Sequence, residues 1–306
     1  MCSSAYPART SLRHVPQDVL AVVPTFRPGP RLIELLTALT QDSSPVTSVL
    51  ISDDASPCSF DAVLRGIANS SRVRVVRHTR NAGIARGLNE GLAAAAALDA
   101  AWLLTVDQDS AIEPGTLAAL VHTAVDVRTT HPTVGVLAPG RIDDAAGTLA
   151  VPGAPWQRGL LSAWEVMQSG ALWSVPALRA IGGFDASLGM DGVDASACLG
   201  LREAGYLVLV DPALTIGHQV GDPTRSRTVR IFGHSSAHTA HGPRRRTSMI
   251  QARIRLFPRE WRQSPGNALR TLRRVAVSAG ITIALERDRW AQAQASMRGV
   301  REGLRR

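Results

Sequence analysis

The chain has 306 residues, 45% of them apolar, which is enough to bury the core of a full α/β domain. Its 34 basic residues are all arginines and the formal net charge is +9, which predicts an anionic partner such as a nucleotide phosphate, a lipid headgroup or a nucleic acid. Three cysteines without C-x-x-C spacing argue against both a disulfide framework and a structural zinc site.

The N-terminal residues contain no apolar segment after a basic start, and the apolar runs of the chain are shorter than the roughly 20 residues that cross a bilayer. Together with the cysteine pattern, this favours a cytoplasmic protein. Residues 1–18 are expected to form an N-terminal tail.

From residue 19 to residue 139, short β-branched runs alternate with stretches of helical periodicity. This alternation is typical of an α/β fold in which a mostly parallel sheet is flanked by helices on both faces. The predicted strands are Leu20–Thr25, Val46–Ser52, Val73–Val76, Trp102–Val106 and Val134–Leu137. The predicted helices are Pro30–Thr40, Asp61–Ala68, Ile84–Leu98 and Pro114–Val127.

Residues 140–225 resume the same pattern after a Gly- and Pro-rich stretch, and we interpret them as the acceptor-binding half of one domain. The elements predicted here are strands at Gly170–Val175 and Leu207–Val210 and a helix at Val193–Glu203. Residues 226–306 are expected to form a C-terminal appendage. It would consist of a mobile loop, within the polar stretch 221–246, and basic helices starting near Ser248 and Asn267.

Acidic residues follow two of the predicted strands. Asp53 and Asp54 close the second strand, and Asp107-Gln108-Asp109 follows the strand that ends at Val106. Ligands of open α/β sheets bind at this edge, where two such groups would lie close together. Carboxylate oxygens suit Mg²⁺ or Mn²⁺, so Asp107 and Asp109 are predicted to hold a divalent cation. For Asp54, capping of the following helix is an equally good interpretation.

The segment from Arg80 to Gly91 opens a helix after the third strand with glycines and amides. Free backbone N–H groups there can bind phosphate or sugar oxygens, although the glycines would serve tight packing equally well. The donor nucleotide is assigned to the strand ends and this helix start, namely Thr25, Asp53, Asp54, Asn81, Gly83, Arg86, Asn89 and Asp107.

Further carboxylates lie in the turn that precedes the helix at Val193. Transfer to a hydroxyl with inversion needs a base, and Asp194, with Asp191 as the alternative, is the candidate catalytic residue. Helix N-capping is the competing interpretation for both. Farther on, His218 follows a strand and is a candidate third metal ligand.

Taken in order, the segments VVPTF, SDDAS, RNAGIARGLNEG, LLTVDQDS, SGALWS, GGFD, MDGVD and GHQVG resemble the family-2 glycosyltransferases of the GT-A fold. DQDS and the basic terminus Met297–Arg306 resemble the rhamnosyltransferase branch. The resemblance implies a Rossmann-like domain whose nucleotide-sugar-binding half spans 19–139. It also implies that Asp53 contacts the base, that Asp107, Asp109 and His218 serve the diphosphate and metal, and that Asp194 is the base. The chain departs from the family pattern after Asp194, where an acid and an arginine are replaced by Ser196 and Gly200.

The predicted function is transfer of a sugar, with rhamnose favoured, from a dTDP- or UDP-sugar to a glycan or lipid-linked acceptor of the cell envelope. A nucleotidyltransferase, an inactive sugar-nucleotide binder and a basic nucleic-acid-binding protein are the alternatives. Aromatics are only 4% of the residues, which leaves few stacking platforms and argues against nucleic acid.

An apolar helical face and nearby arginines predict contact with an anionic membrane surface, on the inner face of the plasma membrane. Arginines 270, 273 and 274 are expected to point away from this face. The residues of the face are Ala268, Leu272, Val275, Ala276, Ala279 and Ile283.

Overall fold

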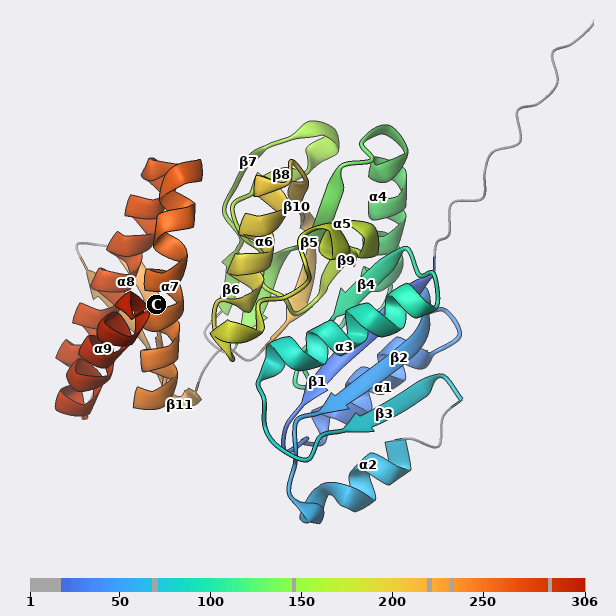
Figure 1. Cartoon of the computed structure of the whole chain (residues 1–306), viewed down its shortest axis with the longest axis horizontal. Coiled ribbons are helices and arrows are strands. Elements are labelled where there is room, and N and C mark those ends of the chain that lie inside the picture. Colours follow the sequence, from blue (N-terminus) through green and yellow to red (C-terminus); the bar gives the residue numbers. More distant parts are fainter. Residues whose placement is uncertain are drawn as a thin grey trace, which may run out of the picture.

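A computed structural model describes residues 18–67, 71–144, 147–218, 222–231, 234–285 and 288–305. The tail predicted for residues 1–18 lies outside this part of the chain, apart from residue 18. The centre of the molecule is a mixed, mostly parallel sheet flanked by helices, with further helices at the C-terminus (Figure 1).

The strands of the large sheet run in the order β3-β2-β1-β4-β9-β5-β10-β8-β7, and β6 pairs with β5. Strands β1 to β4 are parallel neighbours, β9 lies antiparallel between β4 and β5, and β10 runs parallel to β5. The strands are β1 Val19–Thr25, β2 Val46–Asp53, β3 Val73–Arg77, β4 Trp102–Thr105, β5 Val134–Asp144, β6 Gly147–Ala150, β7 Gly153–Pro155, β8 Leu161–Ala163, β9 Ala171–Ser174 and β10 Leu207–Gly217.

The alternation of side chains along β1 separates two cores. Leu20 and Val22 face helices α3, α5 and α6, whereas Val19, Ala21 and Val23 face α1 and α4. All these β1 side chains are buried, as expected for a strand covered on both faces. The helices are α1 Arg31–Thr40, α2 Asp61–Ile67, α3 Ile84–Ala97, α4 Thr116–Thr130, α5 Val175–Ala180 and α6 Val193–Glu203.

The strands and helices predicted for 19–139 are present. Strand β5 continues to Asp144 instead of ending at Leu137, and the other ends differ by at most three residues. The start of α4 is one such difference, because Gly115 adopts a left-handed φ of 83° and the helix begins at Thr116. Pro114 therefore precedes the helix. One sheet runs through both predicted halves of the domain, since β10 pairs with β5, so the boundary at residue 139 remains a functional interpretation.

The stretch predicted as a mobile loop contains a hairpin instead, formed by β11 Asp222–Ile231 and β12 His234–Ala240. The β-branched residues of the segment favour an extended backbone, and pairing in an antiparallel ladder satisfies its polar groups. Helix α7, Pro243–Gln263, begins earlier than predicted because Pro243 fits the first turn. Helices α8, Pro265–Leu285, and α9, Arg289–Leu304, follow.

The C-terminal helices pack on one another and on the sheet domain. Ala252 and Leu256 of α7 join the core that covers α6, and an added Cβ at Gly192 would lie 2.7 Å from the Cβ of Ala252. Helix α9 lies close to α7, since an added Cβ at Gly299 would lie 2.7 Å from the carbonyl oxygen of Thr247. Among the described residues, no helix is both long and apolar enough to cross a membrane.

Candidate active site

Thr25 and Asp53 end the neighbouring strands β1 and β2 and pair in the sheet register. The Asp53 side chain is fully buried, and its oxygens accept hydrogen bonds from Ser56 N (3.1 Å), Ser56 Oγ (2.5 Å) and Thr25 Oγ1 (3.4 Å). Arg77 forms an ion pair with it at 3.3 Å. Asp53 therefore anchors the sheet edge, and it is Thr25 and Asp54 that line the cavity described below.

Asp54 holds the loop that leads into α3. Its carboxylate accepts hydrogen bonds from the backbone N–H groups of Ala82 (2.7 Å) and Gly83 (2.9 Å), and Asn81 Nδ2 donates to its carbonyl oxygen (3.3 Å). Gly83 has a φ of +88°, and an added Cβ would lie 2.7 Å from the carbonyl oxygen of Gly189. A glycine is therefore required where the two loops meet. Asp54, Asn81 and Gly83 all line the cavity.

Besides Asp53, two further predicted donor residues lie outside the cavity lining. Asn89 donates to the carbonyl oxygen of Phe184 and accepts from its N–H group, both at 2.8 Å, which ties α3 to the loop after α5. Arg86 pairs with Glu90 on the exposed side of α3, at 3.4 Å. These contacts indicate packing roles, and the predicted donor contacts of Asn89 and Arg86 find no support in this arrangement.

Asp107, Asp109 and His218 come together at the edge of the sheet, although His218 is far away in the sequence. The backbones of Ala111 and Gly217 pair through hydrogen bonds of 2.8 and 2.9 Å, which brings the end of β10 beside the loop after β4. His218 Nε2 lies 3.6 Å from Asp107 Oδ2, and its Nδ1 lies 3.7 Å from Asp109 Oδ1. Local sequence therefore places the acids, and strand pairing adds the histidine.

These three side chains fit a divalent cation. Each offers a ligand atom, and the three atoms lie within 4.8 Å of one another. Burial raises the pKa of Asp107 to about 6, with the neighbouring Asp109 adding to the rise and His218 opposing it. A bound cation would relieve this crowding of negative charge, and two carboxylates with an imidazole form a suitable donor set for Mn²⁺ or Mg²⁺. Gln168 donates to the other oxygen of Asp107 and orients that carboxylate.

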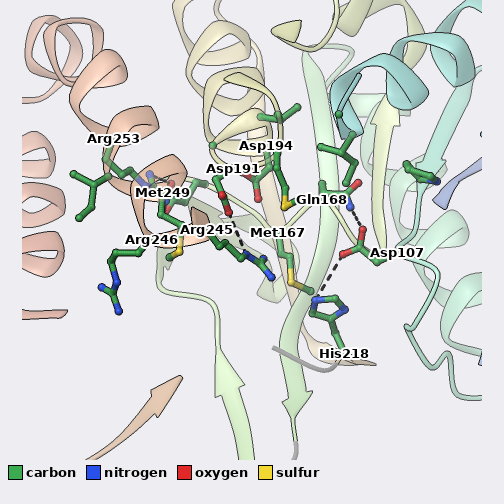
Figure 2. A pocket seen from close by; sticks show the side chains of 18 of the residues that line it. Asp107, Met167, Gln168, Asp191, Asp194, His218, Arg245, Arg246, Met249 and Arg253 are labelled. Atoms are coloured by element: carbon green, nitrogen blue, oxygen red, sulfur yellow. Dashed lines mark hydrogen bonds and ion pairs between the residues drawn. The ribbon is translucent and has the colours of Figure 1, made fainter. Parts of the chain in front are cut away.

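Asp191 and Asp194 lie at the start of α6, close to the C-terminal helices (Figure 2). The N-cap of α6 is Gly192 and no side chain caps it, so neither aspartate has the predicted capping role. Burial raises the pKa of both carboxyl groups, and Glu165 adds to the effect at Asp194. Asp194 Oδ1 accepts a hydrogen bond from Ala195 N at 2.8 Å, and Asp191 pairs with Arg245 at 3.4 Å.

Glu165 and Arg253 are site residues that sequence reasoning missed. They form a bidentate ion pair of 2.6 and 3.0 Å beside Asp194, and the charge of Arg253 opposes the rise in the pKa of Asp194. The family pattern places an acid and an arginine in the helix after Asp194, where this chain has Ser196 and Gly200. The pair supplies such charges from two other segments, and no local motif could have revealed a contact across 88 residues.

A cavity of 670 Å³ connects these groups. One end is lined by the strand ends with Thr25, Asp54 and Asn81, and the centre by the group of Asp107, Asp109 and His218. Beyond Asp194, the wall is formed by α7 and α8. Figure 2 shows Arg245 reaching from α7 towards the space between Asp191 and His218. The cavity therefore joins the group of Asp107, Asp109 and His218, which could hold a metal, to the partly buried carboxylate of Asp194.

Residues 20–139 match the family model described as glycosyl transferase family 2. Comparison with curated proteins gives no match. Solved structures with a similar fold include GalNAc-T7 with UDP, GalNAc and Mn²⁺, at 13% identity and a TM-score of 0.57, where the match covers 79% of this chain and 47% of that one. The chain thus spans about half of that protein.

For two further solved structures, the match covers a larger share of their own chains. The mannosyltransferase PcManGT from Pyrobaculum calidifontis, in complex with GDP-Man and Mn²⁺, has 17% identity and a TM-score of 0.54, with 91% of this chain and 78% of that one covered. S. aureus TarS 1–349 has 15% identity and a TM-score of 0.54, with 94% and 81% covered. The chain has the GT-A fold, and the family match supports a glycosyltransferase of family 2.

Proposed function

We propose that the protein is an inverting glycosyltransferase that moves a sugar from a nucleotide-diphosphate donor to an acceptor of the cell envelope. The observation that carries this proposal is that Asp107, Asp109 and His218 share one cavity with the partly buried carboxylate of Asp194. A metal ion held by the three residues would stabilise the negative charge that gathers on the departing diphosphate. A nearby base is the second requirement of such a transfer.

The roles of the protein groups follow from their positions along the cavity. Thr25, Asp54 and Asn81 border the end that would take the nucleoside, and Gly83 allows the loops to close there. Asp194 accepts the proton of the acceptor hydroxyl while the oxygen of that hydroxyl forms a bond to the anomeric carbon. The bond from the anomeric carbon to the diphosphate oxygen breaks on the opposite face, and its electron pair leaves with the diphosphate. The two charges of the Glu165–Arg253 pair act on the pKa of Asp194 in opposite directions, since Glu165 raises it and Arg253 lowers it.

Donor identity is tested by calorimetric titration of the protein with dTDP, UDP and GDP, with and without Mn²⁺. We expect dTDP or UDP to bind at least tenfold more tightly with Mn²⁺ than without it, which corresponds to about 1.4 kcal/mol. Rhamnose is the favoured sugar because the DQDS segment resembles the rhamnosyltransferase branch. Tight binding of GDP alone would contradict the nucleotide assignment, and metal-independent binding of all three would contradict the metal-dependent site.

The remaining alternatives predict different outcomes in assays of the same protein. An inactive relative would bind nucleotide with Mn²⁺ but would neither transfer nor hydrolyse the sugar. A nucleotidyltransferase would release pyrophosphate from a nucleoside triphosphate and a sugar phosphate. The charges beside Asp194 support an active transferase, since Glu165 and Arg253 form a partly buried ion pair next to the proposed base.

The C-terminal helices support peripheral binding to an anionic membrane. Only part of the apolar face predicted for α8 is exposed, however. Ala268 is buried and Val275 lines the cavity, so these two residues of the face do not lie on the outer surface that would contact a bilayer. Other large apolar side chains of α8 and α9 are exposed, and arginines accompany them. The exposed apolar residues are Leu269, Leu272, Val277, Trp290, Met297, Val300 and Leu304.

A change of Trp290 and Met297 to glutamine is expected to weaken binding to anionic vesicles by roughly tenfold, because both side chains would lose their insertion into the bilayer interface. Trp290 is 76% exposed and Met297 66%, so folding should be unaffected. Co-sedimentation with anionic and neutral vesicles measures the effect. The control is Ile33→Gln on α1, which is 56% exposed. Equal binding of the wild type to both vesicle types, or none to either, contradicts the membrane proposal.

A further inference from the structure

The cavity continues past Asp194 into a groove between α7 and α8 that the donor site does not need. Apart from Arg245 and Arg253, which pair with Asp191 and Glu165, the residues of its wall have no role in the chemistry described above. Helix α7 contributes one face and helix α8 another, both at helical spacing. The lining residues from these helices are Arg245, Arg246, Met249, Ile250, Arg253, Thr271, Arg274, Val275 and Ser278.

This part of the wall is apolar and cationic. Met249, Ile250 and Val275 supply flexible or branched apolar surface, and Met190 extends it across the groove. Among the described lining residues, the only phenylalanine, tyrosine or tryptophan is Phe26, which lies at the opposite end beside Gln108. A neutral glycan is usually bound by aromatic faces and by amide or carboxylate side chains, so this wall is poorly suited to hold one. An apolar chain next to an anion matches it better.

The arginines of the groove differ in whether a carboxylate already neutralises their charge. Arg253 pairs with Glu165 and Arg245 with Asp191. Within the described part of the chain, no carboxylate lies at ion-pair distance from Arg274. Its charge acts at longer range on Glu260. Burial raises the pKa of Glu260, and the charges of Arg253 and Arg274 oppose this rise. Arg274, an exposed residue that borders the cavity, thus offers a cation that a bound anion can neutralise.

We propose that the acceptor is a phosphate-bearing amphiphile whose phosphate binds Arg274 and whose apolar chain packs on Met249, Ile250 and Val275. This inference rests on the proposed transferase function and names the class of acceptor for the same site. The phosphate lies in the α7–α8 groove, and the sugar hydroxyl to be extended faces Asp194.

Calorimetric titration of the full chain with octyl phosphate, octanol and inorganic phosphate tests the proposal, because these probes separate the amphiphile from its two parts. We expect octyl phosphate to bind more tightly than either of the others. Arg274→Gln should weaken octyl phosphate binding by roughly tenfold, the loss expected for a charge-assisted hydrogen bond. Arg273→Gln is the matched control, since Arg273 is the adjacent exposed arginine outside the cavity lining, and this variant should bind octyl phosphate as tightly as the wild type does.

A second variant isolates the apolar part of the groove. Met249→Gln should weaken octyl phosphate binding and leave the binding of inorganic phosphate unchanged. Equal affinity of wild type and Arg274→Gln for octyl phosphate overturns the proposal. So does inorganic phosphate binding as tightly as octyl phosphate, which would indicate a free-phosphate site. Binding of dTDP and of UDP with Mn²⁺ is measured in parallel, and the absence of both in the wild type would reject the proposed transferase independently of the groove.

Discussion

Replacing Asp194 by asparagine is expected to lower the turnover number by roughly three orders of magnitude, the contribution of a well-placed general base. Asparagine keeps the oxygen that accepts the hydrogen bond of Ala195 but cannot take up the acceptor proton. Nucleotide affinity should stay within about twofold of the wild type, because the substituted group touches the acceptor rather than the donor. Steady-state kinetics with saturating donor, together with calorimetry of the nucleotide diphosphate, measures both quantities.

The pH dependence gives an independent check. Burial and the charge of Glu165 raise the pKa of Asp194, and a base must be ionised to act. Activity should therefore fall as the pH is lowered through a value above the ordinary aspartate pKa of about 3.9. Because the folded state binds this proton more tightly than the unfolded state, the associated stability is present below the unfolded pKa and is lost as the pH rises through the folded pKa. The Asp194→Asn variant, which has no charge to bury, should therefore have an equal or higher Tm at neutral pH.

Two aspartate variants serve as comparisons. Asp211→Asn changes an aspartate of β10 outside the cavity lining and should leave turnover unchanged. Asp191→Asn removes the partner of Arg245, so its effect is expected to be smaller than that of Asp194→Asn. An active Asp194→Asn together with an inactive Asp191→Asn would transfer the role of base to Asp191.

Replacing Asp109 by alanine is expected to reduce turnover by a hundredfold or more, since loss of a metal ligand removes charge stabilisation worth roughly several kcal/mol. The Asp109 side chain is 44% exposed, so its removal should leave the Tm nearly unchanged. Turnover is measured with Mn²⁺ and with EDTA, and Mn²⁺ binding is followed by its paramagnetic resonance signal.

Glu113→Ala is the control for this substitution. Glu113 is an exposed carboxylate a few residues along the same loop, outside the group that can hold a metal. Its removal should change neither Mn²⁺ binding nor turnover. Full activity of the wild type in EDTA would contradict a metal-dependent reaction, and undiminished Mn²⁺ binding by Asp109→Ala would move the cation to other ligands.

The sequence by itself determined the sheet edge and its acids. The runs at Val19 and Trp102 are short, apolar and bounded by polar residues, and they form buried strands because few other conformations can bury such segments on both faces. Since parallel strands end at one edge, Asp107 and Asp109 could be expected near the strand end at Asp53 from the order of elements alone. Local periodicity and strand direction carry this much information.

Tertiary structure decided which of these side chains face the cavity. Adjacent residues of one motif take opposite roles, since the oxygens of Asp53 are occupied by Ser56, Thr25 and Arg77 while Asp54 borders the cavity. The Glu165–Arg253 pair and the α7–α8 wall depend on contacts between segments far apart in the chain. Burial and long-range pairing are properties of the packed molecule, so no local pattern of residues encodes them.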